Sequence, residues 1–135
     1  MAEVFARLFH VTGDPAWRTR AEGVIRASTG DEDRLVLMPT LLAAADLLEE
    51  GVELVVSGAA DHPLARALAK VGLAAPDPAV TLLRPPAPEK LSEAHPAHGK
   101  NAGPAGAAAY LCHHAACSLP ITEPALLATR LRSRN

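Results

Sequence analysis

Cysteine and histidine side chains gather in the last third of the sequence, where they could bind a metal or exchange electrons. The stretch YLCHHAACSLP, from Tyr110 to Pro120, holds both cysteines of the chain with two adjacent histidines between them, and two more histidines stand upstream in the segment HPAH. Thiolate and imidazole are common ligands of tetrahedral zinc. One candidate is therefore a zinc site with ligands drawn from Cys112, Cys117, His113, His114, His95 and His98.

Other interpretations compete with zinc, whose usual cysteine spacing and turns this stretch matches poorly. A loop carrying His95 and His98 would also lose conformational entropy on closing the site. A disulfide between Cys112 and Cys117 is favoured over zinc, because a chain folding back after a strand brings the Cα atoms within about 7 Å. Buried packing of both cysteines as free thiols is favoured over both the zinc site and the disulfide. Thiol catalysis is least favoured, since no residue that would orient a histidine base is identifiable.

Composition and charge limit the classes of protein. The chain has 135 residues, a length typical of one domain, and it is 49% hydrophobic but only 3% aromatic, which favours closely packed helices. A net charge of -2 gives no field that would hold a nucleic acid. The sequence shows neither an apolar run of membrane-spanning length nor a signal peptide. We expect a cytoplasmic protein with reduced thiols and no membrane partner.

The first fifty residues predict three helices. Apolar residues recur at helical spacing from Val4 to Thr12, and the pattern ends at Gly13. Asp14 then caps a second helix that runs to Gly30 with a proline in its first turn. A third helix is expected to start near Pro39 and to turn four residues inward: Leu41, Leu42, Ala45 and Leu48. The acidic residues of the break between these helices are interpreted as a solvated turn: Asp31, Glu32 and Asp33.

From Gly51 the pattern changes to strands. Residues 52–57, 79–84 and 107–112 predict three short strands, the first of them covered on both faces. A helix with Asp61 as its cap lies between the first two strands, and a final helix is expected to start at Thr122 as N-cap. Strand, helix, strand implies a parallel crossover. The predicted fold is α/β: a helical hairpin and third helix, then a small, mostly parallel three-stranded sheet with crossover helices.

Residues 85–106 are rich in proline, glycine and alanine without periodicity, and we expect a mobile loop there. The chain divides into a helical segment, residues 1–50, and an α/β unit, residues 51–135, within one compact domain.

Three weaker candidate sites lie outside the cysteine stretch. The turn before Asp61 has one glycine and an acidic cap, which argues against a phosphate site. His10 and the arginines Arg130, Arg132 and Arg134 are interpreted as partners of helix C-terminal dipoles.

Three stretches resemble the C-terminal region of the YyaL-like family, relatives of spermatogenesis-associated protein 20: VFARLFHVTGDPAWRTRAEGVI, MPTLLAAADLLEEGVELVVSG and AAYLCHHAACSLPITEPALL. The positions that carry the resemblance are Tyr110, Cys112, Cys117, Pro120 and Thr122. The family resembles a thioredoxin-like domain joined to an α/α barrel. This chain lacks the Cys-x-x-Cys motif and most of the barrel, so the resemblance implies a C-terminal piece that corresponds to the last barrel helices plus an appended α/β unit.

The resemblance implies a structural or interaction module with no enzyme activity of its own and no cofactor. Helices that would pack against barrel neighbours keep an apolar face, and Phe5, Leu8, Phe9 and Trp17 are the candidates for it. We expect a homodimer, or a partner polypeptide, on these helices. The alternative is a redox or metal site at Cys112 and Cys117 that contributes to an enzyme acting on a thiol or a sugar.

Overall fold

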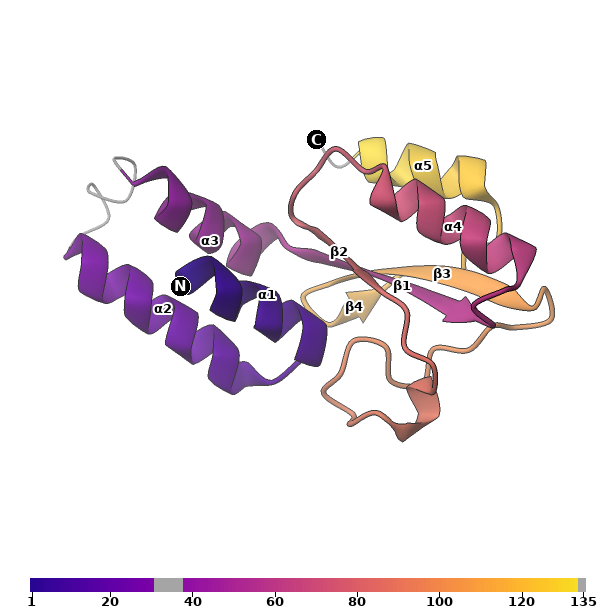
Figure 1. Ribbon diagram of the computed structural model, residues 1–135, viewed down its shortest axis with the longest axis horizontal. Helices are drawn as coiled ribbons and strands as arrows, with labels where there is room; N and C mark the ends of the chain where they lie inside the picture. Colours follow the sequence, from indigo (N-terminus) through magenta and orange to yellow (C-terminus); the bar gives the residue numbers. More distant parts are fainter. Residues whose placement is uncertain (31–37, 134–135) are drawn as a thin grey trace.

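The computed structural model describes residues 1–30 and 38–133 (Figure 1). The predicted solvated turn at Asp31, Glu32 and Asp33, and the arginine Arg134, lie outside these residues. The protein contains both helices and strands, and three N-terminal helices stand at one end of a four-stranded sheet (Figure 1). Within the described ranges, no helix combines the length and the apolar character needed to cross a membrane.

The three predicted N-terminal helices are confirmed as α1 (Ala2–Thr12), α2 (Pro15–Thr29) and α3 (Pro39–Glu50). Gly13 ends α1 in the left-handed conformation, and the Asp14 side chain caps α2 by accepting the N–H of Ala16 at 2.9 Å. Small residues let the helices approach closely, because Ala6 and Ala21 are fully buried between them. The inward face of α3 differs from the prediction: Leu42 is 43% exposed, whereas the face that packs on α1 is formed by Ala44, Leu47 and Leu48.

The sheet has the strand order β2-β1-β3-β4. Its strands are β1 (Val52–Gly58), β2 (Val80–Leu83), β3 (Ala107–His113) and β4 (Ala116–Cys117). β1 and β2 are parallel and are joined through α4 (Pro63–Leu73), as the sequence predicts. The prediction of a mostly parallel, three-stranded sheet is wrong, because β3 runs antiparallel to β1 and β4 antiparallel to β3. A parallel third strand needs a crossover back to the starting edge, usually a helix, whereas the segment before β3 contains only the short helix η2 (Pro88–Lys90).

Each face of the sheet has its own cover. Helices α4 and α5 (Pro124–Arg132) lie over one face, where Leu54, Leu68 and Leu127 are fully buried (Figure 1). The segment of residues 85–106, predicted as a mobile loop, packs on the other face. There the Ser57 hydroxyl donates to the carbonyl of Lys100 at 2.9 Å, and Ala97 is fully buried. This loop therefore covers a second hydrophobic core on that face of the sheet. Its sequence, rich in glycine and proline and without helical periodicity, gave no sign of this packing.

Two predicted helix caps are wrong for the same reason. α5 has Glu123 rather than Thr122 at its N-cap, and α4 has His62 rather than Asp61. Neither cap residue makes a side-chain hydrogen bond to its helix. In both helices a proline takes the first helical position, where its missing N–H and fixed φ suit the start of a helix, so the N-cap is the residue immediately before it.

Candidate functional site

The two cysteines face each other across a β-hairpin that the sequence did not predict. β3 and β4 are joined by a two-residue turn in which His114 has φ 47° and Ala115 has φ 64°. Positive φ at both central positions is the requirement of a type I′ turn, whose usual sequence is Asn-Gly. Here the two central residues are His and Ala, so the sequence lacks the usual turn signal. The sequence analysis therefore predicts a strand that leads directly into the last helix.

Cys112 and Cys117 form a disulfide in this structure. They are register partners, with Cα atoms 4.0 Å apart, and the next pair along the hairpin is hydrogen bonded from Ser118 N–H to Leu111 O at 2.8 Å. Paired residues of an antiparallel ladder alternate between bonded and unbonded positions, and the unbonded positions are closer together. The hairpin therefore places the cysteines at an unbonded, closely spaced pair, and the disulfide, ranked below buried packing from the sequence, is what the structure contains.

The two cysteine residues differ in their exposure to solvent. Cys112 is 2% exposed and packs with Val55 and Tyr110 in the core beneath the loop, which agrees with the buried packing predicted for it. Cys117 is exposed, so its predicted packing under the loop is wrong. β4 is a two-residue edge strand, and nothing in the described fold continues the sheet beyond it. A thiol in solution can therefore approach the bond from the side of Cys117.

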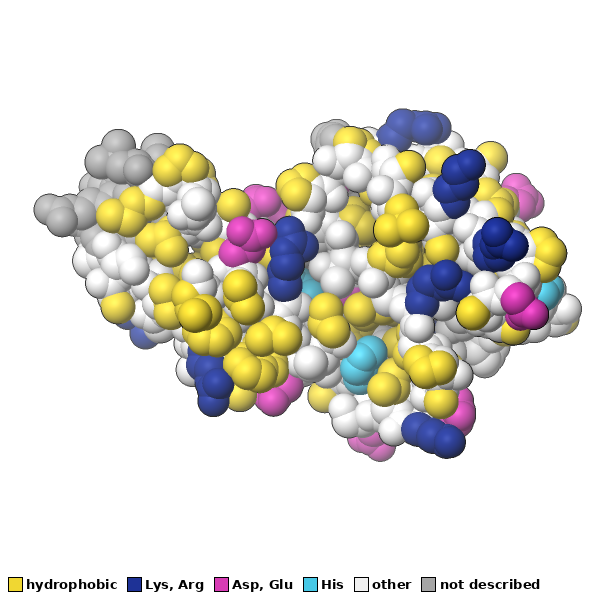
Figure 2. Space-filling model, viewed as in Figure 1, with side chains coloured by type: hydrophobic (Ala, Val, Ile, Leu, Met, Phe, Trp, Pro, Cys, Tyr) yellow, Lys and Arg dark blue, Asp and Glu magenta, His cyan; other side chains and the backbone are white. Residues whose placement is uncertain are grey.

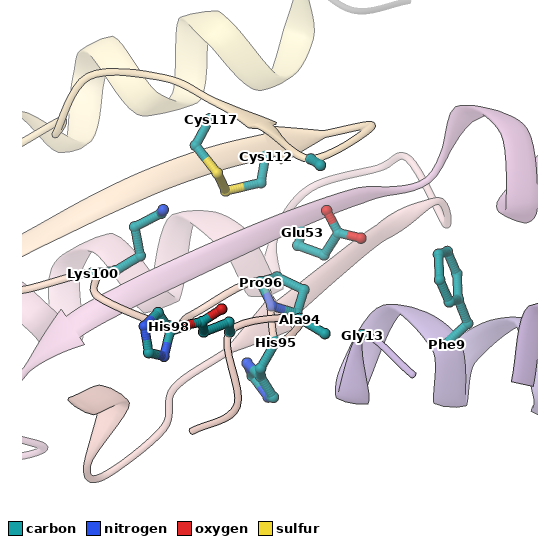
Figure 3. A pocket seen from close by; sticks show the side chains of 12 residues that line it. Phe9, Gly13, Glu53, Ala94, His95, Pro96, His98, Lys100, Cys112 and Cys117 are labelled. Atoms are coloured by element: carbon teal, nitrogen blue, oxygen red, sulfur yellow. A yellow bond between two sulfur atoms is a disulfide. The ribbon is translucent and has the colours of Figure 1, made fainter. Parts of the chain in front are cut away.

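A pocket of 280 Å³ opens beside the disulfide (Figure 3). Its walls come from the end of α1, from β1, from the hairpin and from the loop, and the residues that bear polar or reactive groups are Glu53, Glu93, His95, His98, Lys100, Cys112 and Cys117. Figure 3 shows the disulfide on one side of this space, with His98 and His95 on the opposite side. The structure thus brings His95 and His98 to the same pocket as the cysteines, whereas neither His113 nor His114 lines it.

Three of the four histidines in the predicted zinc set have one ring nitrogen in contact with the backbone. His95 Nδ1 accepts the N–H of Ala97 at 3.0 Å, His98 Nδ1 lies 2.8 Å from the carbonyl oxygen of Leu91, and His113 Nε2 lies 3.3 Å from that of Glu49. Both sulfurs are joined in the disulfide. Among the described residues, no group of three or more His, Cys, Asp or Glu side chains is arranged to hold a metal ion. Zinc at this site stays a prediction for the reduced protein.

Burial changes the titration of one histidine of the pocket. Desolvation lowers the pKa of His95 below its ordinary value of 6.5, and a hydrogen bond to the backbone of Val11 acts in the opposite direction. Because Nδ1 of this ring accepts the Ala97 N–H, it carries no hydrogen, and the other ring nitrogen is the protonated one. His95 is therefore a neutral bridge between the loop and the end of α1.

A buried histidine–carboxyl pair lies beside the strand position of Cys112, and the sequence analysis does not predict it. His10 Nδ1 lies 2.5 Å from Glu53 Oε1, and the two residues are only 3% and 8% exposed. The prediction that His10 interacts with the dipole of its own helix is therefore wrong. Its side chain instead connects α1 with β1 through Glu53. A signal was present: Glu53 is the one charged residue in the apolar run VELVV, and a buried carboxylate requires a partner.

The His10–Glu53 pair holds one proton between its two side chains. Nε2 of His10 lies 2.7 Å from the carbonyl oxygen of Leu47, which can only accept, so Nε2 carries a hydrogen. The short contact of Nδ1 with Oε1 also requires a hydrogen. The pair is consequently either imidazolium with carboxylate or imidazole with carboxylic acid. In both forms a single proton lies between Nδ1 and Oε1, and the net charge is zero.

Strand register extends the site across the sheet. Thr81 is paired with Glu53, Glu53 with Cys112, and Cys112 with Cys117, so these four side chains form a row on the face covered by the loop. The Thr81 hydroxyl is buried and has no hydrogen-bond partner among the described residues. A second pocket of 330 Å³ lies beside Glu53 and is lined also by Phe9, His10 and Arg18. Glu53 thus stands between the two cavities.

The remaining predicted residues are the other positions of the family resemblance and the four interface candidates. Tyr110 donates its hydroxyl to the carbonyl of Asn101 at 2.8 Å, whereas Pro120 and Thr122 are exposed. The four interface candidates are half-buried, and Phe5 stacks on Trp17 with ring centroids 5.8 Å apart; the set is Phe5, Leu8, Phe9 and Trp17. The exposed apolar side chains of this region belong to Met1, Val4 and Val11. Figure 2 shows hydrophobic side chains gathered over the N-terminal helices.

Comparisons with protein-family models, with curated proteins and with solved structures found no match to this chain.

Proposed function

We propose that the protein carries a thiol–disulfide exchange site in which Cys117 is the sulfur attacked and Cys112 the leaving sulfur. The observation that supports this most directly is the difference in exposure across one bond: Cys117 is exposed at a sheet edge and Cys112 is buried beside a pocket. Exchange requires an incoming thiolate to reach one sulfur in line with the bond. Cys117 is the more exposed residue of the disulfide and therefore the favoured point of attack.

The reaction proceeds in two displacements with a small thiol RSH as reductant. A thiolate RS⁻ attacks Cys117 Sγ, an RS–S bond forms, and the Cys112–Cys117 bond breaks with its electron pair moving to Cys112 Sγ. A second RS⁻ then attacks the RS sulfur of the mixed disulfide, which releases RSSR and leaves Cys117 as a thiolate. Two electrons pass from two thiols to the protein disulfide. The cytoplasm, which is the compartment we propose for the protein, supplies thiols of this class.

Lys100 favours this chemistry by its charge. It lines the pocket with the disulfide, and its Nζ lies 5.9 Å from the centre of the Tyr110 ring (Figure 3). A neighbouring cation favours the anionic form of a thiol and draws an incoming thiolate. Glu93 lines the same pocket and opposes this effect. We therefore expect the favourable effect of positive charge to be confined to the part of the pocket near Lys100.

A structural or interaction module, such as the C-terminal cap that the YyaL-like resemblance implies, is the second candidate. The observation that favours it is the apolar surface of α1, where Met1, Val4 and Val11 are exposed. A homodimer or a partner polypeptide that covers α1 and α2 would bury these side chains. In that case the disulfide would serve as a staple of the hairpin. Light scattering at high protein concentration tests the homodimer, and a monomeric mass contradicts it.

Trapping of a mixed disulfide tests the exchange site. The variants Cys112→Ser and Cys117→Ser are each incubated with oxidised glutathione, and the adduct is measured by mass spectrometry. We expect rapid glutathionylation of Cys112→Ser, whose free Cys117 is exposed, and little of Cys117→Ser until urea unfolds it. Equal labelling of the two folded variants would contradict the assignment of roles. A wild-type disulfide that thiols reduce only in urea would contradict the proposed function itself.

Elemental analysis of the reduced protein tests the zinc prediction in the same preparation. One metal ion per chain that is lost in Cys117→Ser would support it.

A further inference from the structure

We infer that the buried His10–Glu53 pair supplies the proton that Cys112 takes up when the disulfide opens. This inference rests on the proposed exchange function and assigns the proton donor of that same site. It follows from three features: the register of Glu53 with Cys112, the single proton held between His10 and Glu53, and the burial of the leaving sulfur.

Register places the donor beside the leaving sulfur. Glu53 and Cys112 are directly opposed in the antiparallel pair of β1 and β3. Opposed residues have Cβ atoms about 4.5 to 5.5 Å apart and project to the same face of the sheet. Glu53 and Cys112 both line the pocket beside the disulfide, whereas His10 does not, and Figure 3 shows the Glu53 carboxyl group on the Phe9 side of its strand. Glu53 is thus the member of the pair that shares this pocket with Cys112.

Burial makes a donor necessary. Cys112 is 2% exposed, so the thiolate formed when the disulfide breaks lies largely out of water. A low-dielectric environment disfavours an anionic sulfur relative to a neutral thiol. Proton transfer to the leaving sulfur during bond cleavage moves the negative charge from the thiolate to the Glu53 carboxylate, which is the weaker base. The pair, neutral before the transfer, then carries that charge until it takes up another proton.

The proton can be followed through the whole exchange. As the Cys112–Cys117 bond breaks, the proton of the pair passes through the Glu53 carboxyl group to Cys112 Sγ. His10 and Glu53 are then left as imidazole and carboxylate, with a nitrogen lone pair directed at Oε1. This arrangement is repulsive, so the pair readily accepts a proton from the second RSH as that thiol becomes RS⁻. The pair returns to its starting form, and Cys117 takes its proton from solvent.

Other charged groups surround the pair from every packed element. Arg18 of α2 lines the second pocket, but its guanidinium donates to Glu22 and to Glu49 and to the Leu48 carbonyl. The remaining titratable groups of the two cavities are Glu93, His95, His98, Lys100 and His114. In the part of the chain that the structure describes, the side-chain partner of Glu53 is His10. The proton transfer tested below is therefore assigned to the pair.

The test is the rate of disulfide reduction by a small dithiol, measured against pH for the wild type and Glu53→Gln. Glutamine keeps the size of Glu53 and can donate to Nδ1, but it cannot transfer the proton. Each rate is divided by the thiolate fraction of the reductant. We expect the corrected rate of the variant to be roughly tenfold or more below that of the wild type at neutral pH. The corrected rate of the variant should rise as the pH falls, because solvent must then supply the proton.

Glu49→Gln is the matched control, since Glu49 is a carboxylate of the same region that pairs with Arg18 away from the disulfide. Circular dichroism confirms that each variant is folded, and if Glu53→Gln is not, His10→Gln and the solvent deuterium isotope effect on the wild-type rate replace it. Slowing in D₂O supports the donor role, and its absence contradicts it. A folded Glu53→Gln with the wild-type rate and pH profile would overturn the inference alone, whereas a wild-type disulfide inert to thiols would overturn the proposed function.

Discussion

Gly51 leaves the space that the imidazole of His10 occupies. A Cβ at position 51 would lie 2.4 Å from both Cε1 and Nε2 of His10 and 2.3 Å from the carbonyl oxygen of Leu47. Both neighbours hold the ring in place, because that carbonyl also accepts the Nε2 hydrogen. The residue between α3 and β1 thus fixes where the proton-bearing pair lies.

Gly51→Ala should destabilise the protein by about 1 to 3 kcal/mol, as overpacking of a filled site does. The measurement is the free energy of unfolding by urea. Gly23→Ala is the control: position 23 lies within α2 with nothing within 4 Å of the added methyl. That substitution should stabilise the protein by up to about 1 kcal/mol, since alanine is the better helix former. Equal effects of the two substitutions would show that His10 moves aside freely.

Gly13→Ala should cost more stability than Gly30→Ala, although both glycines end helices with positive φ, 71° and 68°. Both substitutions place an L residue at positive φ, which costs roughly 1 to 2 kcal/mol in the left-handed region of Gly13, whereas Gly30, with ψ -39°, lies outside that region. Of the two, and counting only residues that the structure describes, a methyl at position 13 alone meets another segment, because its Cβ would lie 2.0 Å from the carbonyl oxygen of Ala94. Urea unfolding of both variants measures the difference. Equal losses would indicate that the loop does not bear on the end of α1.

Replacing the turn His114-Ala115 by Asn-Gly should stabilise the hairpin. Relief of two positive φ angles contributes roughly 1 to 2 kcal/mol per residue, and the added freedom of glycine in the unfolded chain offsets about 0.5 to 1 kcal/mol of it. The double variant should therefore melt at a higher temperature than the wild type, by calorimetry, with the disulfide intact. The variant with only Ala115→Gly should show part of the gain. A lower melting temperature for both would contradict the turn geometry.

His95 should make stability fall in mild acid. Its pKa is lowered in the folded protein by desolvation, so below the ordinary value of 6.5 the unfolded chain binds more protons than the folded one. Stability contributed by the neutral ring is complete above that value and is lost as the pH falls toward the folded pKa. Urea midpoints of the wild type and His95→Gln, measured from about pH 8 to about pH 5, should therefore converge in acid. Parallel curves would show that His95 does not titrate differently on folding.

Local sequence signals predicted the elements whose determinants are near in the chain. Gly13 and Asp14 mark the join between α1 and α2, and the apolar run of β1 ends at Gly58, as the structure shows. The caps of α4 and α5 were misplaced because acidic and hydroxyl side chains were weighed above the prolines that follow them. The parallel pair of β1 and β2 was also predictable, since a helical crossover lies between them.

The direction of β3 and the site itself depend on contacts between distant parts of the chain. Whether residues 85–106 cross back or fold over one face is decided by packing of Ala97 and Lys100 on the sheet, which no local periodicity records. The disulfide between Cys112 and Cys117 was one of the predicted alternatives, but the exposure of Cys117 follows from the unpredicted hairpin. His10 and Glu53 are 43 residues apart, and only the lone charge in an apolar strand pointed to such a pair.

The position of β1 between β2 and β3 has a consequence for synthesis on the ribosome. β1 pairs with β2 soon after it emerges, because only α4 separates them, but its other edge waits for β3. Until β3 is synthesised, that edge presents unpaired N–H and C=O groups on a buried, apolar strand, which is the kind of surface that pairs with other chains. A nascent chain halted before Ala107 is therefore expected to aggregate, and the whole loop must emerge before the sheet can be completed.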